Sequence, residues 1–381
     1  MTDKDIKILL YFIISSFILI LITNSYFDYA DSAIYGGSDG RFYIKISDSF
    51  PNFATNVEYI KGERFLIPFL IGSLGHFFSI DNFLIYRFLS IFLSIIFIFV
   101  FVKIILKFNL DLFSKFASIG LIIFNPYLIR YFLAVPTSIL DLIFIISSLI
   151  ILLGFYEKKF FLILCGFSIS LIARQNAIIF LSAFVIAKIF FKKKSFLSNH
   201  QILYLIIAFI FIFFLNTFYA INAAGIYLKL AKGSYIETLA GIFIDNYNYK
   251  EFIQYILMPF FSFGPLIIFI LFKFFNTELI DYKNETTIIV IVSSILIIMI
   301  GFVSGPIVTG KNLIRLSNLS YPMILIIVNQ MCESKTALVP NKIKTILLSL
   351  FLVFWSFHPT FSNVEMFVFI KHYFNNLLLV N

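Results

Sequence analysis

Long runs of isoleucine, leucine and phenylalanine limit most strongly what this chain can fold into. Runs such as 82–106 and 286–303 match the roughly 20 apolar residues that cross a bilayer as a helix. Hydrophobic residues make up 61% of the chain and charged residues 13%, which excludes an ordinary soluble enzyme and a disordered chain. Alternating ten-residue segments are absent from the sequence, so we predict an all-α polytopic transmembrane bundle rather than an outer-membrane barrel.

Apolar segments of span-like length number about eleven. They lie near 8–24, 82–106, 113–128, 137–155, 160–174, 177–191, 202–218, 256–275, 286–303, 317–332 and 343–358. We expect 8–24 to be retained as the first span, because the residues at its end, Thr23 to Phe27, make a poor signal-peptide cleavage site. No polar stretch is long enough to fold alone, so residues 1–381 are predicted to form a single transmembrane domain.

Lysines predict the orientation of the bundle. They fall at every second boundary between spans, at Lys4/Lys7, Lys103/Lys107, Lys158/Lys159, Lys192/Lys193/Lys194, Lys273/Lys283 and Lys335/Lys342/Lys344. Because lysine collects on the cytoplasmic side, we expect a multi-pass protein of the cell (inner) membrane with its N-terminus in the cytoplasm. The net charge of +9 is then a topology signal, and no nucleic-acid partner is expected.

Two large loops lie on the predicted outer face. The first, 25–80, begins with the most polar stretch of the chain, 25–63, and ends with the segment 64–80. Counting 64–80 as a span would invert every later lysine cluster, so we expect it to lie in the outer interface or to re-enter the membrane. The second loop, 219–255, is rich in tyrosines, which suit either sugar stacking or an interfacial aromatic belt.

The arginines are distributed differently from the lysines. In this topology all six lie on the outer side, at Arg41, Arg64, Arg87, Arg130, Arg174 and Arg315. Arginine presents a planar fork of donors that matches phosphate oxygens, and lipid phosphates lie at that depth. Each arginine could instead pair with an outer acid such as Asp141 or extend to lipid phosphate in general. For the set, we favour recognition of a phosphate ligand.

The loop after the first span carries a family resemblance. It contains Tyr35-Gly36-Gly37-Ser38-Asp39-Gly40-Arg41-Phe42-Tyr43, followed by Asp48-Ser49-Phe50 and Glu63-Arg64-Phe65-Leu66-Ile67-Pro68-Phe69-Leu70. Further motifs are Pro136-Thr137-Ser138-Ile139-Leu140-Asp141 and Ala173-Arg174-Gln175-Asn176-Ala177. Together these stretches resemble bacterial GT-C-type glycosyltransferases, polytopic enzymes that use polyprenyl-phosphate sugars outside the membrane.

The resemblance implies an enzyme and assigns roles to residues. The chain would be the catalytic domain of a glycosyltransferase that moves a sugar, with inversion, from a polyprenyl-phosphate donor in the lipid membrane to a glycan, lipid or protein acceptor. Asp39 would be the catalytic base. The residues expected to bind substrate are Asp48, Arg41, Tyr43, Arg64, Arg130, Asp141, Arg174, Lys311 and Arg315.

Three questions stay open at the level of sequence. The first loop has no adjacent acidic pair, so a divalent metal cofactor is possible but no metal ligand can be named. A lipid-linked-sugar flippase or transporter is an alternative, although transporters usually place charges at the bilayer midplane in repeated halves. A polysaccharide polymerase is the other alternative, and the acidic first loop argues against it.

Overall fold

The computed structural model is built from helices. It describes residues 3–24, 39–110, 112–224, 249–264, 266–267, 284–305 and 312–333, and no strand occurs among them. The helices before the middle of the chain are α1 (Asp3–Asn24), α3 (Gly40–Asp48), α4 (Tyr59–Gly62), α5 (Leu66–Phe78), α6 (Asn82–Ile105), α7 (Leu112–Ile123) and α8 (Ile129–Ala134). The later ones are η1 (Pro136–Ser138), α9 (Ile139–Glu157), α10 (Phe160–Ala173), η2 (Gln175–Ala177), α11 (Ile178–Phe191), η3 (Lys192–Lys194), α12 (Asn199–Ala224), α14 (Tyr249–Phe263), α16 (Glu285–Val303), α18 (Asn312–Asn318) and α19 (Tyr321–Glu333).

The all-α prediction is confirmed, and five helices are long and apolar enough to cross a membrane. They are α1, α6, α9 together with η1, α12 and α16. Each predicted apolar segment up to residue 332 contains a helix, and the segment 343–358 lies outside the described residues. Several of these helices are shorter than a full span, so the number of spans stays a prediction.

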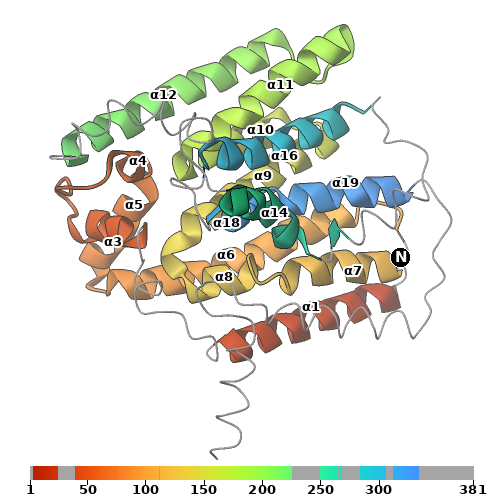
Figure 1. Ribbon diagram of the computed structural model, residues 1–381, viewed down its shortest axis with the longest axis horizontal. Helices are drawn as coiled ribbons and strands as arrows, with labels where there is room; N and C mark the ends of the chain where they lie inside the picture. The colour runs from red at the N-terminus through yellow and green to blue at the C-terminus, as the bar shows by residue number, and fades with distance from the viewer. Residues whose placement is uncertain are drawn as a thin grey trace, which may run out of the picture.

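Helix α9 is the centre of the bundle (Figure 1). Of its apolar window 83% is buried, against 17% for α1 and 22% for α12, which lie on opposite sides of the molecule in Figure 1. A helix that is apolar on every face is suited to such a central position. The outward faces of α1 and α12 expose large apolar side chains, as expected for helices that contact lipid.

One predicted span is shorter than expected. The segment 113–128 is helical only up to Ile123, where α7 ends, and the next helix, α8, begins at Ile129, beyond the predicted segment. Pro126 explains the break, because proline lacks an N–H and restricts the residue before it. The Asn125 side chain accepts a hydrogen bond from the Tyr127 amide at 2.8 Å, which stabilises the turn.

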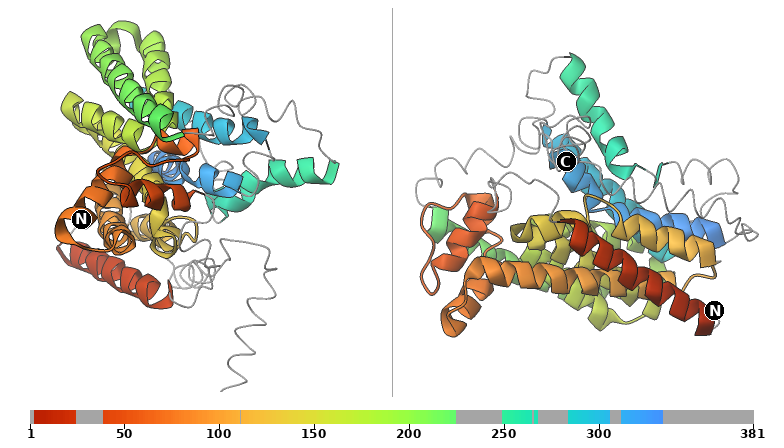
Figure 2. Two further views of the ribbon diagram at one scale, coloured as in Figure 1. Left: turned by 90° about the vertical axis from the view of Figure 1, so that its left-hand side faces the viewer. Right: turned by 90° about the horizontal axis from the view of Figure 1, so that it is seen from below.

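The first loop folds into a small helical layer at one end of the bundle. Helices α3, α4 and α5 lie together at the left of Figure 1 and are seen from that end in the left panel of Figure 2. The segment 64–80 contains helix α5, and its expected place in the outer interface stays a prediction. Residues 25–38 of the predicted loop lie outside the described residues.

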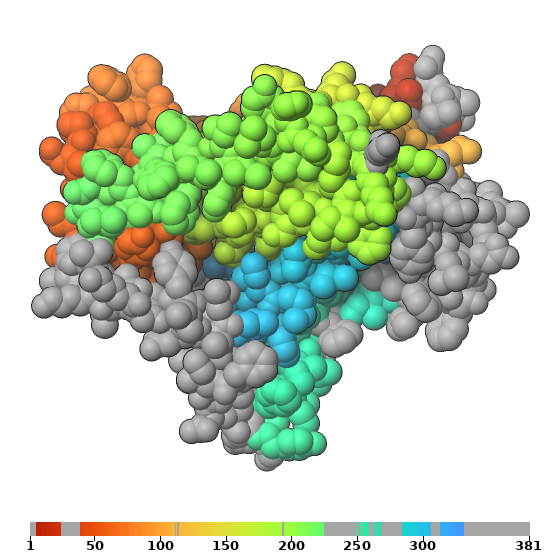
Figure 3. All heavy atoms as spheres, turned by 90° about the horizontal axis from the view of Figure 1, so that it is seen from above, coloured from red at the N-terminus to blue at the C-terminus, as the bar shows by residue number. Residues whose placement is uncertain are grey.

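Helix α12 packs against this layer (Figure 3). The Tyr219 ring stacks on the Phe65 ring with a centroid distance of 4.0 Å, and the Tyr219 hydroxyl accepts a hydrogen bond from the Ala54 amide at 3.3 Å. The predicted second loop is shorter than 219–255, because α12 continues to Ala224 and α14 starts at Tyr249. Residues 225–248 lie outside the described residues.

Candidate functional site

Asp39 lies directly before α3 and contacts two cations from distant parts of the chain. Its Oδ1 lies 2.8 Å from Lys61 Nζ on α4, and its Oδ2 accepts a hydrogen bond from Arg315 Nη2 on α18 at 3.4 Å. Burial raises the pKa of the Asp39 carboxyl, but the charges of Lys61 and Arg315 outweigh burial and hold it well below its ordinary value of 3.8. Asp39 is therefore an ionised carboxylate held between positive charges.

Asp141 forms a second, more deeply buried centre in the first turn of α9. It accepts a hydrogen bond from Arg174 Nη1, and its other oxygen lies 3.5 Å from Arg315 Nε. Arg315 also donates to the Tyr131 hydroxyl at 3.0 Å. Arg315 thus bridges the two acids, so Asp39 and Asp141 belong to one cluster.

Arg174 is placed by a break in a long apolar run. Helices α10 and α11 cover 160–191 almost continuously, but Arg174 itself is extended, with φ −153° and ψ 133°. The short segment Arg174-Gln175-Asn176 carries three consecutive polar residues and turns the chain. At this break Arg174 contacts Asp141 of α9, and Gln175 contacts Arg64 and Glu63 of the first-loop layer.

Arg64 is held by neutral partners at the start of α5. Its Nη1 donates to the Tyr43 hydroxyl at 3.0 Å, and its Nε donates to Gln175 Oε1 at 3.1 Å. Gln175 Nε2 in turn donates to Glu63 Oε2 at 2.8 Å and to the Ile60 carbonyl at 3.0 Å. Gln175 therefore joins the first-loop layer to the turn between α10 and α11.

A close backbone approach fixes Asp39 against the bundle. Gly40, the first residue of α3, lies on Thr137 of η1, and a Cβ at position 40 would collide with the Thr137 side chain. At the other end of α3, Gly72 of α5 lies equally close to the Ser47 backbone. These glycines allow α3 to pack tightly against η1 and α5.

The structure brings together most of the residues that the sequence singled out. One network of contacts joins Asp39, Tyr43, Arg64, Asp141, Arg174 and Arg315. The same network includes Lys61, Glu63, Tyr131 and Gln175, and we call all ten residues the arginine cluster. The sequence reasoning did not select these last four. Gln175 follows a selected arginine in a polar break between apolar runs, and this position could have identified it from the sequence. Lys61 has the sequence surroundings of any loop lysine, so nothing in the sequence distinguished it.

Four selected residues are not placed in the arginine cluster. Asp48 is exposed at the far end of α3 and accepts a hydrogen bond from Asn82 Nδ2 at 2.7 Å. Arg41 is exposed and lies over the neighbouring Phe42 ring at 4.7 Å. Arg130 is buried in α8 and donates to Thr23 Oγ1 of α1 at 3.0 Å. Lys311 lies outside the described residues.

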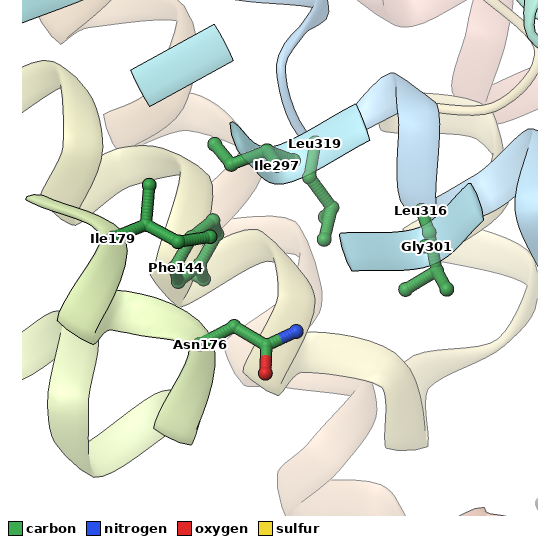
Figure 4. Close-up of a pocket in the computed structure, with 7 residues that line it drawn as sticks. All are labelled: Phe144, Asn176, Ile179, Ile297, Gly301, Leu316 and Leu319. Carbon is green, nitrogen blue, oxygen red and sulfur yellow. The ribbon is translucent and has the colours of Figure 1, made fainter. Parts of the chain in front are cut away.

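A small, mainly apolar pocket adjoins the arginine cluster (Figure 4). Its lining includes Phe144, one helical turn after Asp141, and Leu316, next to Arg315. Asn176, which follows Gln175, contributes the polar amide in Figure 4. The remaining lining residues are Ile179, Ile297, Gly301 and Leu319. Residues that line the apolar pocket therefore lie within one helical turn of charged residues of the arginine cluster.

The arginine cluster is a poor fit for a divalent metal. Its acids Asp39 and Asp141 are each bound by cationic side chains, which would repel a metal ion and already occupy the carboxylate oxygens. Within the described ranges, no group of three or more His, Cys, Asp or Glu side chains could hold a metal ion. An anion suits this set of side chains better.

Comparisons with known proteins add no assignment. No protein-family model, curated protein or solved structure significantly matches the chain.

Proposed function

We propose that the protein is a GT-C-type membrane glycosyltransferase that transfers a sugar from a polyprenyl-phosphate donor to an acceptor hydroxyl. The observation that carries the proposal is the arginine cluster, where an acid after the first helix meets arginines from distant positions along the chain. Arg315 is 276 positions from Asp39, yet their side chains are in contact. The family resemblance of the first loop is independent support.

In the proposed reaction, the acceptor oxygen attacks the anomeric carbon of the donor sugar. The bond from that carbon to the phosphate oxygen breaks, and the acceptor hydroxyl proton passes to the Asp39 carboxylate. The leaving phosphate keeps the bonding electron pair, and cationic groups such as Arg315 stabilise its charge. A single displacement inverts the configuration of the anomeric carbon.

Without a ligand, the Asp39 carboxylate is a weak base, because Lys61 and Arg315 stabilise its ionised form. A phosphate that takes over Arg315 would raise the proton affinity of Asp39. The low pKa of Asp39 is therefore compatible with catalysis if the donor binds before the proton transfer.

We further propose that the arginine cluster faces the extracytoplasmic side. At the opposite end of α9, Glu157 contacts Lys103, Lys107 and Lys159, members of two predicted inner lysine groups. Helix α5 exposes Leu70, Leu74, Phe77 and Phe78 along one face, which suits a helix lying in the outer interface. The N-terminus would then be cytoplasmic.

The orientation is tested by reporter fusions. A reporter that is active only outside the cytoplasm should be active when fused after Tyr59 and inactive when fused after Lys193. These two positions lie on opposite predicted sides of the membrane. The reverse pattern would place the arginine cluster in the cytoplasm and would contradict the proposed site of transfer.

The transfer is tested with Asp39→Asn in proteoliposomes that contain a labelled polyprenyl-phosphate sugar. Loss of the general base should reduce transfer by about 10²–10⁴-fold. The matched control is Asp81→Asn, because Asp81 caps α6 by accepting from the Leu84 amide at 3.0 Å and asparagine caps equally well. Full activity of Asp39→Asn would remove the base from the proposal. Movement of the labelled lipid across the bilayer without sugar transfer would favour a flippase instead.

A further inference from the structure

The arginine cluster contains more cations than its carboxylates neutralise. Three cations, Lys61, Arg174 and Arg315, contact the carboxylates of Asp39 and Asp141. Arg64 adds a fourth cation whose hydrogen bonds go to the neutral Tyr43 and Gln175, so no described carboxylate lies at ion-pair distance from it. Within the cluster, four cations therefore face three carboxylates when the buried Glu63 is counted, and Glu58, outside the cluster, is a further acid near Lys61. A buried guanidinium without a carboxylate is costly and favours an anionic ligand.

The cations differ in how far a ligand can reach them. The side chains of Arg174 and Asp141 are only 4% and 6% exposed and form a closed pair. The side chains of Lys61, Arg315 and Asp39 are 15%, 17% and 22% exposed. Arg64 is 7% exposed, so an incoming anion meets Lys61 and Arg315 before it reaches Arg64 or Arg174. The group already bound between Lys61 and Arg315 is the Asp39 carboxylate.

We propose that Lys61, Arg64 and Arg315 form a subsite for a single phosphate group, and that the Asp39 carboxylate occupies this subsite when no ligand is bound. The inference deepens the proposed function and rests on it for the identity of the ligand, the phosphate of the lipid-linked donor. The proposed subsite changes the role of Arg174, which the sequence analysis expected to bind substrate. Arg174 holds Asp141 and, through Asp141, positions Arg315.

The two contacts of Asp39 indicate how the exchange proceeds. The contact with Lys61 is 2.8 Å, whereas the contact with Arg315 is 3.4 Å and is the weaker hydrogen bond. A phosphate oxygen takes the place of Asp39 Oδ2 at Arg315 and gains Arg64 as a second guanidinium. Asp39 stays near Lys61 and is released from Arg315. The donor therefore binds before the carboxylate is free to accept the acceptor proton.

The competition has a measurable consequence that a plain binding role for Asp39 does not have. If Asp39 and phosphate compete for Arg315, replacing Asp39 with asparagine removes the competing charge. The variant Asp39→Asn should therefore bind phosphate more tightly than the unaltered protein, by about tenfold for one charge-assisted hydrogen bond. The variant Arg64→Gln should bind it about tenfold more weakly.

The experiment uses the purified full chain in nanodiscs with two probes. One arm measures binding of polyprenyl phosphate incorporated in the lipid, and the other measures binding of inorganic phosphate from solution. The matched controls are Asp81→Asn and Arg87→Gln, outside the arginine cluster, and thermal unfolding verifies that each variant is folded. Tightening in the lipid arm alone identifies a lipid headgroup as the ligand, and tightening in both arms shows that free phosphate also enters.

The inference is overturned if Asp39→Asn leaves phosphate affinity unchanged or weakens it in both arms. A misfolded variant cannot imitate the expected result, because the expected result is a gain of affinity. The measurement involves no sugar transfer. Absence of transfer by the unaltered protein, together with tighter phosphate binding by Asp39→Asn, would refute the proposed enzyme and keep the subsite. Transfer by the unaltered protein without tighter binding by the variant would refute only the subsite.

Discussion

Helix α9 carries an acid near each end, and the two acids have opposite surroundings. Asp141, in the first turn, is buried and bound by Arg174 and Arg315. Glu157, the last residue, contacts Lys159 at 2.9 Å and Lys103 and Lys107 at 3.4 Å. With a rise of 1.5 Å per residue, the two acids are about 24 Å apart on one helix.

The exposure of the cations separates the two ends. The lysines at Glu157 have side-chain exposures of 34–63%, whereas Arg174 is 4% and Arg315 17% exposed. Exposed lysine pairs contribute little to stability, so the lysine end needs no explanation beyond membrane orientation. Burying guanidinium groups requires fixed, well-placed partners, and that requirement indicates a constructed site at the arginine end.

Removing the acid at each end of α9 should give very different losses of stability. Asp141→Ala leaves Arg174 buried without its carboxylate and should reduce the free energy of unfolding by about 3–5 kcal/mol. Glu157→Ala leaves exposed lysines that water solvates and should cause no measurable change. Thermal unfolding in detergent, read by loss of the monodisperse peak, compares the two.

A double variant isolates the cause of that loss. In Asp141→Leu/Arg174→Met both charges are absent, so most of the stability lost in Asp141→Ala should return. Arg315 would lose its link to α9 in the same variant, and transfer activity should stay low. Equal stability losses for Asp141→Ala and Glu157→Ala would show that the two ends do not differ in the way described.

A smaller contrast is expected for glutamines at the two ends. Gln175→Leu removes partners from Arg64 and Glu63 and should reduce the free energy of unfolding by about 1–3 kcal/mol. At the lysine side, Gln201 accepts from the Ser198 amide at 2.9 Å in an exposed turn. Gln201→Leu should therefore change thermal unfolding less. A larger loss for Gln201→Leu would contradict the importance given to the Gln175 network.

The smallest expected effect concerns pH. Because the pKa of folded Asp39 is below 3.8, the stabilisation by Lys61 is complete above that pH and is lost only as pH falls through the lower folded pKa. Transfer should therefore show no acid limb from Asp39 between about pH 5 and 8. Lys61→Met removes one cation while burial still raises the pKa of Asp39, so an acid limb should move upward into the measurable range.

The control for this pH profile is Lys103→Met at the lysine end. Lys103 contacts Glu157 and not Asp39, so its removal should leave the profile of kcat/KM unchanged. Lys61→Arg retains the positive charge and should restore the flat profile. An identical profile for Lys61→Met and the unaltered protein would show that Lys61 does not control the protonation of Asp39.

The sequence was sufficient to predict the helices and about half of the residues of the arginine cluster. Apolar runs predicted helices at nearly every place where they occur, because a bilayer-length helix is specified locally. The unusual distribution of arginines also identified Arg64, Arg174 and Arg315 before any contact was known. Which residues meet is a different question, since the partners of Asp39 are set by packing of α3, α4 and α18, and no local pattern contains that information.

Lys61 and Arg130 show two ways in which the arginine cluster differs from the sequence prediction. Lys61 was not selected, and Arg130 was selected but lies outside the cluster. Lys61 lies in a helix of one turn between two loops, and its sequence surroundings do not distinguish it from exposed lysines such as Lys45. Arg130 has the sequence surroundings of a ligand-binding arginine, yet it donates to Thr23 and links α8 to α1. A single buried arginine can therefore serve helix packing, and only the fold separates that role from ligand recognition.

The contact of Gly40 with Thr137 has a consequence for how this protein would tolerate mutation. Gly40 carries no chemical group that could act on a substrate, yet any side chain there must push α3 away from η1. Asp39, the residue before it, would move with the helix and lose its register with Arg315. In a saturation screen, substitutions of Gly40 should therefore be tolerated as poorly as substitutions of the charged residues. A residue with no reactive group would then fix the position of Asp39, the proposed base.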